Sequence, residues 1–224
     1  MEYPHFMYKE AIDFLLENGL KNAIRYEPFL IGDKNYGYDL VFDNWADENE
    51  DFFQKNGIEL DRGESRICIN CVSAPDIIKL NINRATNPYF TSKTPNYCLD
   101  FCRKEAEIYA RARSLGLERF FCGIEFFQKI SDIDFYLQPK IKISESKISE
   151  KFQKLSESEN LDELDFDEFD RLRAVFGDDP EVETLCDFLC SEWDKDMVCS
   201  DLHSGNIGFD RLGRPVLFDY AGFI

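Results

Sequence analysis

Apolar positions along the chain follow two different periods. A period of 3.6 residues over 7–19 and again over 97–115 predicts two amphipathic helices, with a glycine at or just after the end of each. Shorter alternating or continuous apolar runs predict strands through much of the remaining first part of the chain. These predicted strands lie within 25–42, which holds two strands around a turn, and at 65–72, 76–82, 120–127 and 134–141; a short polar helix is predicted over 46–56.

The pattern changes after residue 140. A polar, acidic region with helical spacing continues to about residue 196, and two short apolar runs then bracket Arg211–Arg214 as a hairpin. The predicted fold class is therefore α+β. We expect an N-terminal part, 1–139, with an antiparallel sheet and the helix 97–115, followed by a mainly helical C-terminal part, 140–224.

Charge excludes several classes of partner. The 224 residues carry 26 basic and 44 acidic side chains, a formal net charge of −18, and such a surface repels the phosphates of nucleic acids. No run approaches the ~20 apolar residues of a membrane span, and the acidic N-terminal segment is unlike a signal peptide. We therefore expect a cytoplasmic protein with no nucleic-acid or membrane partner. Imitation of nucleic acid by the acidic segment 157–170 stays open beside its simpler interpretation as a solvated surface.

Eight cysteines raise the alternatives of disulfides, zinc sites or free thiols. Cys68 and Cys71 lie in a predicted strand, where a separation of three puts their side chains on opposite faces. The chain has no second Cys-x-x-Cys pair and only two histidines, so it is poor in zinc ligands. Free thiols in a reducing compartment are the favoured interpretation.

The densest group of chemical side chains lies at 200–220. Asp201, His203 and Asn206 come within six residues of one another, and Asp219 follows after an apolar run. A hairpin between them would fold Asp219 back toward the loop, and Mg²⁺ prefers such carboxylate and amide oxygens. The loop alone could be an Asx-turn in any protein. Its combination with Asp219 favours a site for a metal ion and phosphates.

This segment resembles the protein-kinase-like superfamily. The loop 201–206 reads Asp-Leu-His-Ser-Gly-Asn and matches the kinase pattern D-L-x-x-x-N. The His two places after the Asp makes it similar to the aminoglycoside and choline kinase branch, whose loop reads D-x-H-x-x-N. Asp219-Tyr220-Ala221-Gly222 stands where the D-F-G motif of kinases would be. Cys199-Ser200 stands in place of the His-Arg of protein kinases, which is a further difference from the protein-kinase branch.

The resemblance implies a phosphotransferase that uses ATP and Mg²⁺. It implies two lobes, a small antiparallel-sheet N-terminal lobe and a truncated helical C-terminal lobe. Asp201 would be the catalytic base, and Asn206 and Asp219 would bind Mg²⁺ from the loop and the hairpin 207–222. His203 would be a structural member of the loop.

The same resemblance implies further site residues in the first part of the chain. Lys79 would contact the ATP phosphates from a strand, and Glu105 on the next helix would pair with it, with Glu107 as the alternative partner. Gln138 and Lys140 flank the proline of a connector whose backbone would face adenine. An exposed edge-strand lysine and a surface glutamate are the plain alternatives for Lys79 and Glu105.

Two departures from the family leave the function open. The segment 32–37 has two glycines between strands but does not match the phosphate loop G-x-G-x-x-G. The chain ends at Ile224, so the usual acceptor-binding helices are expected to be missing, as in short kinase-like proteins of bacteriophages and mobile elements. One hypothesis is an ATP/Mg²⁺ phosphotransferase with an unknown acceptor. The other is a pseudokinase or interaction protein that binds nucleotide or a host partner without turnover.

Overall fold

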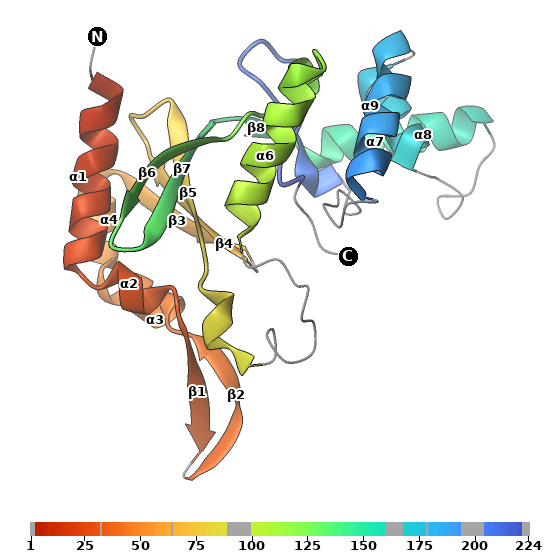
Figure 1. Cartoon of the computed structure of the whole chain (residues 1–224). Helices are drawn as coiled ribbons and strands as arrows, with labels where there is room; N and C mark the ends of the chain where they lie inside the picture. The colour runs from red at the N-terminus through yellow and green to blue at the C-terminus, as the bar shows by residue number, and fades with distance from the viewer. Residues whose placement is uncertain are drawn as a thin grey trace. The chain divides into compact units, whose positions relative to one another are not determined.

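The computed structural model describes residues 3–31, 33–63, 65–88, 100–159, 168–177, 179–193 and 204–220. These residues form a mixed α+β structure with antiparallel strand pairs (Figure 1), which confirms the predicted α+β class. The chain divides into two compact units: unit 1 comprises Met1–Cys102 and Glu125–Gln138, and unit 2 comprises Arg103–Ile124 and Pro139–Ile224. This division assigns most of the predicted helix 97–115 to unit 2, whereas the sequence-based division kept that helix in the N-terminal part.

Unit 1 begins with helices that flank a two-stranded ribbon. The first helix ends before Gly19, whose φ of +94° is a left-handed conformation that glycine adopts without strain. The ribbon extends away from the main sheet of the same unit (Figure 1) and pairs its two strands antiparallel. In chain order these elements are α1 (Tyr3–Glu17), α2 (Leu20–Ala23), β1 (Tyr26–Ile31), β2 (Lys34–Leu40), α3 (Phe42–Glu48) and α4 (Glu50–Asn56).

The main sheet of unit 1 has five strands in the order β3-β4-β5-β7-β6. Its strands are antiparallel in the pairs β3–β4, β4–β5 and β6–β7. Along the chain, a short 3₁₀ turn and a long helix lie between β5 and β6. The elements are β3 (Ile58–Arg62), β4 (Arg66–Cys71), β5 (Asp76–Asn81), η1 (Arg84–Thr86), α6 (Phe101–Ser114), β6 (Glu125–Ile130) and β7 (Ile133–Pro139).

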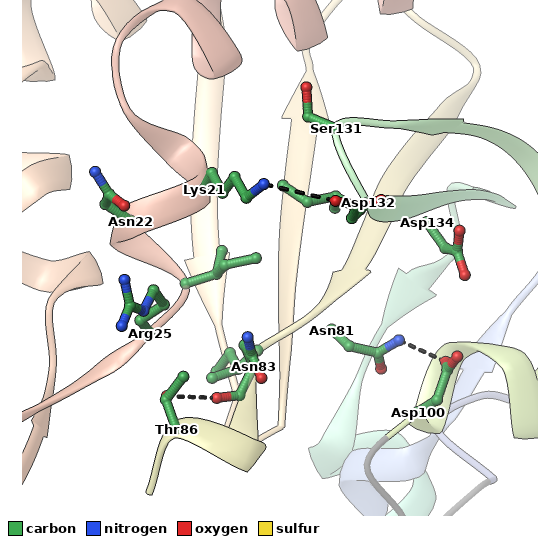
Figure 2. A pocket seen from close by; sticks show the side chains of 13 residues that line it. Lys21, Asn22, Arg25, Asn81, Asn83, Thr86, Asp100, Ser131, Asp132 and Asp134 are labelled. Atoms are coloured by element: carbon green, nitrogen blue, oxygen red, sulfur yellow. Dashed lines mark hydrogen bonds and ion pairs between the residues drawn. The ribbon is translucent and has the colours of Figure 1, made fainter.

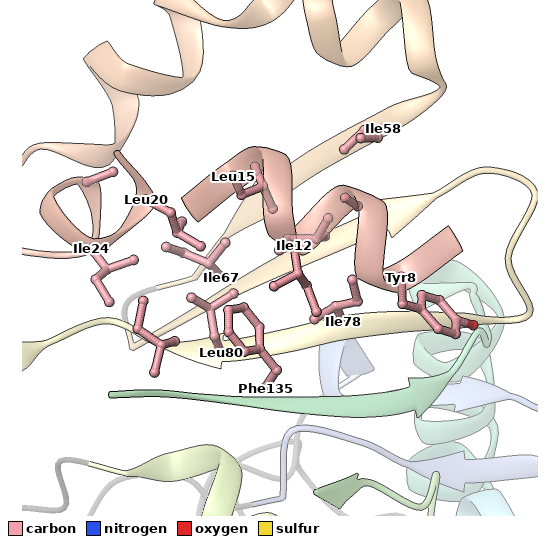
Figure 3. Packing of buried hydrophobic residues seen from close by; sticks show 14 of the residues in the cluster. Tyr8, Ile12, Leu15, Leu20, Ile24, Ile58, Ile67, Ile78, Leu80 and Phe135 are labelled. Atoms are coloured by element: carbon pink, nitrogen blue, oxygen red, sulfur yellow. The ribbon is translucent and has the colours of Figure 1, made fainter. Parts of the chain in front are cut away.

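The core of unit 1 lies between α1 and one face of this sheet (Figure 3). Alternate residues of a strand face opposite sides of a sheet, so Ile78 and Leu80 of β5 point to the same side. Both are fully buried and lie in one cluster with α1 residues such as Ile12 and Leu15. Burying each of these aliphatic side chains contributes about 1.5–3 kcal/mol to folding. The sheet face under α1 therefore contributes substantially to the stability of unit 1.

The structure corrects three of the predicted elements. The strand β3 was not predicted at all, and the helix predicted over 46–56 consists of the two helices α3 and α4. These helices are not polar, because they bury Phe42, Trp45 and Phe53. The strand predicted at 120–127 begins only at Glu125, because the 3₁₀ turn η2 (Glu118–Phe120) and a buried extended segment precede it.

Unit 2 combines the rest of α6 with helices and a small sheet of order β10-β9-β8. The helices α7 and α8 pack on each other, as do α8 and α9, and α7 also packs on η4 and β9. The predicted C-terminal hairpin is present as β9 and β10. The elements are β8 (Lys142–Ile143), α7 (Glu145–Glu159), α8 (Glu168–Phe176), α9 (Pro180–Trp193), η4 (Ser204–Asn206), β9 (Ile207–Phe209) and β10 (Pro215–Leu217).

Ion pairs connect α6 and η2 to α9 within unit 2. Arg111 of α6 donates from Nε to Oε2 of Glu192 at 2.9 Å, and its Nη2 contacts the same oxygen. Glu192 is only 1% exposed, and a carboxylate buried to this degree needs such a partner. Arg119 of η2 contacts Asp179 and Glu181 at 2.7 and 2.8 Å, and its hydrogen bond holds the pKa of Asp179 below the usual value.

A buried tyrosine makes the stability of unit 1 sensitive to alkaline pH. Tyr8 Oη donates to Asp76 Oδ2 and accepts from the Asp76 backbone N–H, both at 3.0 Å, and burial raises the pKa of Tyr8 to about 12 from 10.0. The folded state therefore holds this proton more tightly than the unfolded state does, so its stabilising effect is complete below pH 10 and is lost as the pH rises toward 12. We predict that the stability advantage of the wild type over Tyr8→Phe shrinks across this window, measured by urea unfolding at several pH values. An advantage that stays constant from pH 8 to 11.5 would contradict this assignment.

Candidate functional site

The hairpin β9–β10 brings Asn206 and Asp219 to the same end of one strand ladder. Pro215, Val216 and Leu217 oppose Phe209, Gly208 and Ile207 in antiparallel register. The backbone N–H of Phe218 donates to the Asn206 carbonyl at 3.0 Å, which continues this ladder by one step. Asn206 therefore lies opposite the residue that precedes Asp219.

The turn of this hairpin is closed by a side chain. Asp210 Oδ1 accepts from the backbone N–H groups of Leu212 and Arg214 at 2.8 and 2.9 Å, and Arg214 Nε donates to Oδ2 at 2.8 Å. Desolvation of the Asp210 carboxyl acts to raise its pKa, but these hydrogen bonds outweigh it and hold the pKa below the usual value. Gly213, with a φ of +76°, supplies the left-handed residue that the turn requires. The register of β9 and β10 is thus specified locally.

Asp219 has a positive φ, which is uncommon for residues other than glycine. Its φ is +54°, in the left-handed region. In an extended strand, residue 219 would point to the face opposite Phe218 and its ladder partner Asn206, because side chains alternate. The left-handed conformation removes this alternation at the position where a carboxylate would have to face the Asn206 amide. Strain of this kind costs about 1–3 kcal/mol and is concentrated at functional sites.

The donor set at this end of the hairpin suits Mg²⁺ better than zinc. Asn206 offers an amide oxygen and Asp219 a carboxylate, and Mg²⁺ is commonly held by one or two such groups together with phosphates and water. Among the described residues, His, Cys, Asp and Glu form no group of three or more that could hold a metal ion. The cysteines within the described ranges are free thiols, which agrees with the prediction.

Lys79 lies on the central strand β5 of the unit 1 sheet, between β4 and β7. It is 2% exposed and alternates with Ile78 and Leu80, so it faces the side of the sheet opposite the α1 core. The interpretation of Lys79 as an exposed edge-strand lysine is therefore wrong. Lysines are almost never buried unless their charge is compensated, so Lys79 remains a candidate site residue.

Burial also separates the two glutamates that were candidates on α6. Glu105 is fully buried, whereas the Glu107 side chain is 51% exposed and lies 3.8 Å from Arg103 in a surface ion pair. The surface interpretation is therefore wrong for Glu105 and applies to Glu107. Lys79 belongs to unit 1 and Glu105 to unit 2. The ion pair predicted between them stays a prediction.

The start of α6 is fixed by a side chain of β5. Asn81 Oδ1 accepts from the Cys102 backbone N–H at 3.0 Å, and Asn81 Nδ2 donates to Asp100 at 2.6 Å. The first N–H groups of a helix lack partners within the helix, so this contact satisfies one of them. Sequence analysis did not identify Asn81, which lies two residues after Lys79 and ties the lysine strand to the beginning of the glutamate helix.

The remaining predicted site residues fall in different places. The chain passes from unit 1 to unit 2 between Gln138 and Pro139. Gln138 is buried and Lys140 is half-buried. Asp201 and His203 lie outside the described residues. The described part of the glycine-containing segment, 33–37, belongs to the β1–β2 ribbon, which forms a two-stranded sheet separate from the one that carries Lys79.

A polar depression of about 510 Å³ lies in unit 1, beside the turn between β6 and β7 (Figure 2). That turn holds Ser131 and Asp132 at φ values of +51° and +68°, as two-residue hairpin turns require. Two ion pairs lie at the depression: Lys21 Nζ lies 3.7 Å from Asp132, and Asp134 lies 3.5 Å from Lys129. None of the predicted site residues lines it, so we place the candidate site at the hairpin instead.

Comparison with known proteins gives no relative from which a function could be inferred, so the assignment of a function depends on the chemistry of these residues. No protein-family model matches the chain, and a search of curated proteins found no similar sequence. Within the described ranges, no helix combines the length and the apolar character needed to cross a membrane.

The strained backbone at Asp219 predicts an ordered series of stabilities. Glycine and asparagine tolerate the left-handed conformation, whereas in alanine the Cβ comes too close to the following carbonyl oxygen. We expect the free energy of unfolding of Asp219→Ala to be about 1 kcal/mol lower than that of Asp219→Gly. The free energy of unfolding of Asp219→Asn should be close to that of the glycine variant. Urea denaturation of the three variants measures this order. Equal stabilities of the alanine and glycine variants would show that the φ of residue 219 is not positive in solution.

Proposed function

We propose that this protein is a kinase-like phosphotransferase that binds ATP with Mg²⁺, and that units 1 and 2 correspond to the two lobes of that fold. The observation that carries the proposal is the hairpin that places Asn206 and Asp219 one ladder step apart. Those two residues occupy the positions that the sequence resemblance gives to the metal ligands.

The order of elements in unit 1 supports the same proposal. In protein kinases the lysine that contacts the phosphates lies on the third strand, and its glutamate partner lies on the helix αC. Lys79 lies on β5, the third strand of the five-stranded sheet in chain order, and Glu105 lies on α6, which precedes the fourth strand. Both side chains are buried. A buried lysine and a buried glutamate are costly to maintain for stability alone, which favours a functional role.

The chemistry that these residues would perform is mainly electrostatic. Phosphoryl transfer depends on positioning and charge neutralisation rather than on covalent catalysis by the protein. Bound Mg²⁺ would neutralise charge on the phosphates, and Asn206 and Asp219 would hold it. Lys79 would neutralise further phosphate charge. Asp201 would orient the acceptor hydroxyl and accept its proton.

A nucleotide-binding interaction protein without turnover is the second candidate. The observation that favours it is the ribbon β1–β2, where three consecutive apolar residues are exposed: Phe29 at 47%, Leu30 at 56% and Ile31 at 57%. Contiguous apolar exposure of this kind is typical of surfaces that contact a partner. Both candidates share the nucleotide site and differ in whether Asp201 supports transfer.

We predict that ATP binding depends on Mg²⁺ and that Asp219→Asn removes most of this dependence. Asparagine keeps the left-handed backbone and the shape of the side chain but loses the charge that attracts the cation. Isothermal calorimetry should show at least about tenfold weaker MgATP binding for this variant, the scale of one charge-assisted contact. Asp187→Asn, at an exposed aspartate of α9, is the matched control and should bind as the wild type does. Equal MgATP affinity in the wild type and Asp219→Asn would contradict the metal assignment.

Catalysis separates the two candidate functions. If the protein transfers phosphate, Asp201→Asn should lower the rate by ~10²–10⁴ while changing ATP affinity by less than about twofold, because the base acts in the transition state. Autophosphorylation and ATP hydrolysis with radiolabelled ATP measure the rate, and calorimetry measures the affinity. A wild type that binds MgATP but turns over no faster than Asp201→Asn would establish the interaction protein instead.

A further inference from the structure

We infer that Tyr220 is a positioning residue that holds Asp219 in its metal-binding conformation through a hydrogen bond to the backbone of Cys122. This inference rests on the proposed function, because it concerns the same candidate Mg²⁺ site. The contact was not expected from the sequence. Cys122 lies in the buried segment between η2 and β6, nearly a hundred residues before Tyr220.

The hydroxyl of Tyr220 donates to the Cys122 carbonyl at 3.2 Å. The tyrosine is 1% exposed, and its ring lies edge-to-face on Phe121 with centroids 4.9 Å apart. Phe121 in turn contacts Phe188 of α9 edge-to-face at 6.1 Å. The side chain directly after Asp219 is therefore packed into the interior of unit 2, and its one polar atom has a specific partner.

The same short segment also fixes the chain before Asp219. The Cys122 backbone N–H donates to the Leu217 carbonyl at 2.8 Å, and Phe121 forms a parallel bridge with Leu217. On the other side of the strand, Phe218 donates to Asn206. Asp219 therefore lies between two residues that are each held by hydrogen bonds, one by the strand ladder and one by the tyrosine hydroxyl.

These two attachments explain why an aspartate can remain at a φ of +54°. A strained backbone persists only where the surroundings over-determine it. Without the hydroxyl contact, rotation at residue 219 could relax toward the extended conformation, in which the side chain would alternate away from Asn206. This relaxation would weaken the binding of a shared cation. The Asn206 amide oxygen and the Asp219 carboxylate must lie on the same side of the hairpin to bind one ion.

Cys122 makes a third contact, through its side chain. Its Sγ lies 3.3 Å from the carbonyl of Pro139 and donates to it. Pro139 is the first residue of unit 2 after the second crossing from unit 1, at the connector that the sequence resemblance places against adenine. One buried residue thus touches both the strand that leads to Asp219 and this connector. The hydroxyl of Tyr220 completes the arrangement from the C-terminal side.

The test compares two variants that each remove one hydroxyl from a buried tyrosine. Tyr220→Phe keeps the ring contacts with Phe121 and removes the hydrogen bond to Cys122. Tyr8→Phe is the matched control, because Tyr8 is equally buried and also hydrogen-bonded but lies in unit 1 on Asp76. Isothermal calorimetry measures ATP affinity for the wild type and both variants with Mg²⁺ and with EDTA, and thermal unfolding measures their midpoints.

We expect both variants to unfold at lower temperature than the wild type, which shows that each hydroxyl contributes to folding. Only Tyr220→Phe should weaken MgATP binding, by about fivefold, the scale of one hydrogen bond. Its ATP affinity in EDTA should match that of the wild type, because the effect acts through the metal ligand. A merely structural role would weaken ATP binding equally with and without Mg²⁺.

The possible failures are distinguishable. If the wild type shows Mg²⁺-dependent ATP binding that Asp219→Asn removes and Tyr220→Phe leaves unchanged, the positioning role of Tyr220 is wrong and the proposed function stands. If Tyr220→Phe and Tyr8→Phe weaken MgATP binding alike, the effect is general destabilisation and the positioning role is again wrong. If the wild type binds ATP equally in Mg²⁺ and EDTA, or not at all, both the proposed function and this inference fail.

Discussion

Unit 1 depends on the packing of α1 against one face of its five-stranded sheet. The strand β5 contributes Ile78 and Leu80 to that interface, and alternation then fixes Lys79 on the other face. A slip of one residue in the register of β5 would turn Lys79 into the apolar core and move the two aliphatic residues to the opposite face, a change that burial of an uncompensated charge makes prohibitive. The interaction that stabilises the sheet is therefore the same one that determines where the lysine lies. Stability and the placement of a candidate phosphate contact are not separable on this strand.

Local patterns in the sequence were sufficient to predict much of this fold. The alternation in β4 and β5, the helical period of α6 and the turn residues of the β9–β10 hairpin each identify one element without reference to the rest of the molecule. The strand β3 escaped prediction because its sequence, Ile-Glu-Leu-Asp-Arg, is short and half charged. The segment before β6 was misread as strand because its apolar residues are buried by tertiary contacts, and burial of a non-periodic segment leaves no period to detect.

The sequence predicted the candidate site about as completely as it predicted the fold. The sequence is sufficient to place Asn206 and Asp219 on opposite arms of a hairpin, but not to show the left-handed backbone at Asp219, because that conformation is maintained by Cys122 from a distant part of the chain. It favoured Glu105, which lies near the apolar face of an amphipathic helix, and kept Glu107 as the alternative. The structure separates them clearly, because Glu105 is buried and Glu107 lies in a surface ion pair. Long-range contacts thus determine features of the site, such as backbone conformation and burial, that the periodicity of the sequence does not indicate.

The interrupted course of unit 1 along the chain has a consequence for how the protein is made. The strand β7 must insert between β5 and β6 to complete the sheet, yet Arg103–Ile124 of unit 2 is synthesised between β5 and that insertion. Closing so long a loop is entropically unfavourable until the β5–β7 contacts form, so we expect the pairing of β7 with β5 to be a late step. On the ribosome, α1 and the first three strands emerge well before their missing neighbours. During that interval the outer edge of β5 has unsatisfied backbone groups, so the nascent chain has to avoid pairing with other chains until residue 139 has been released.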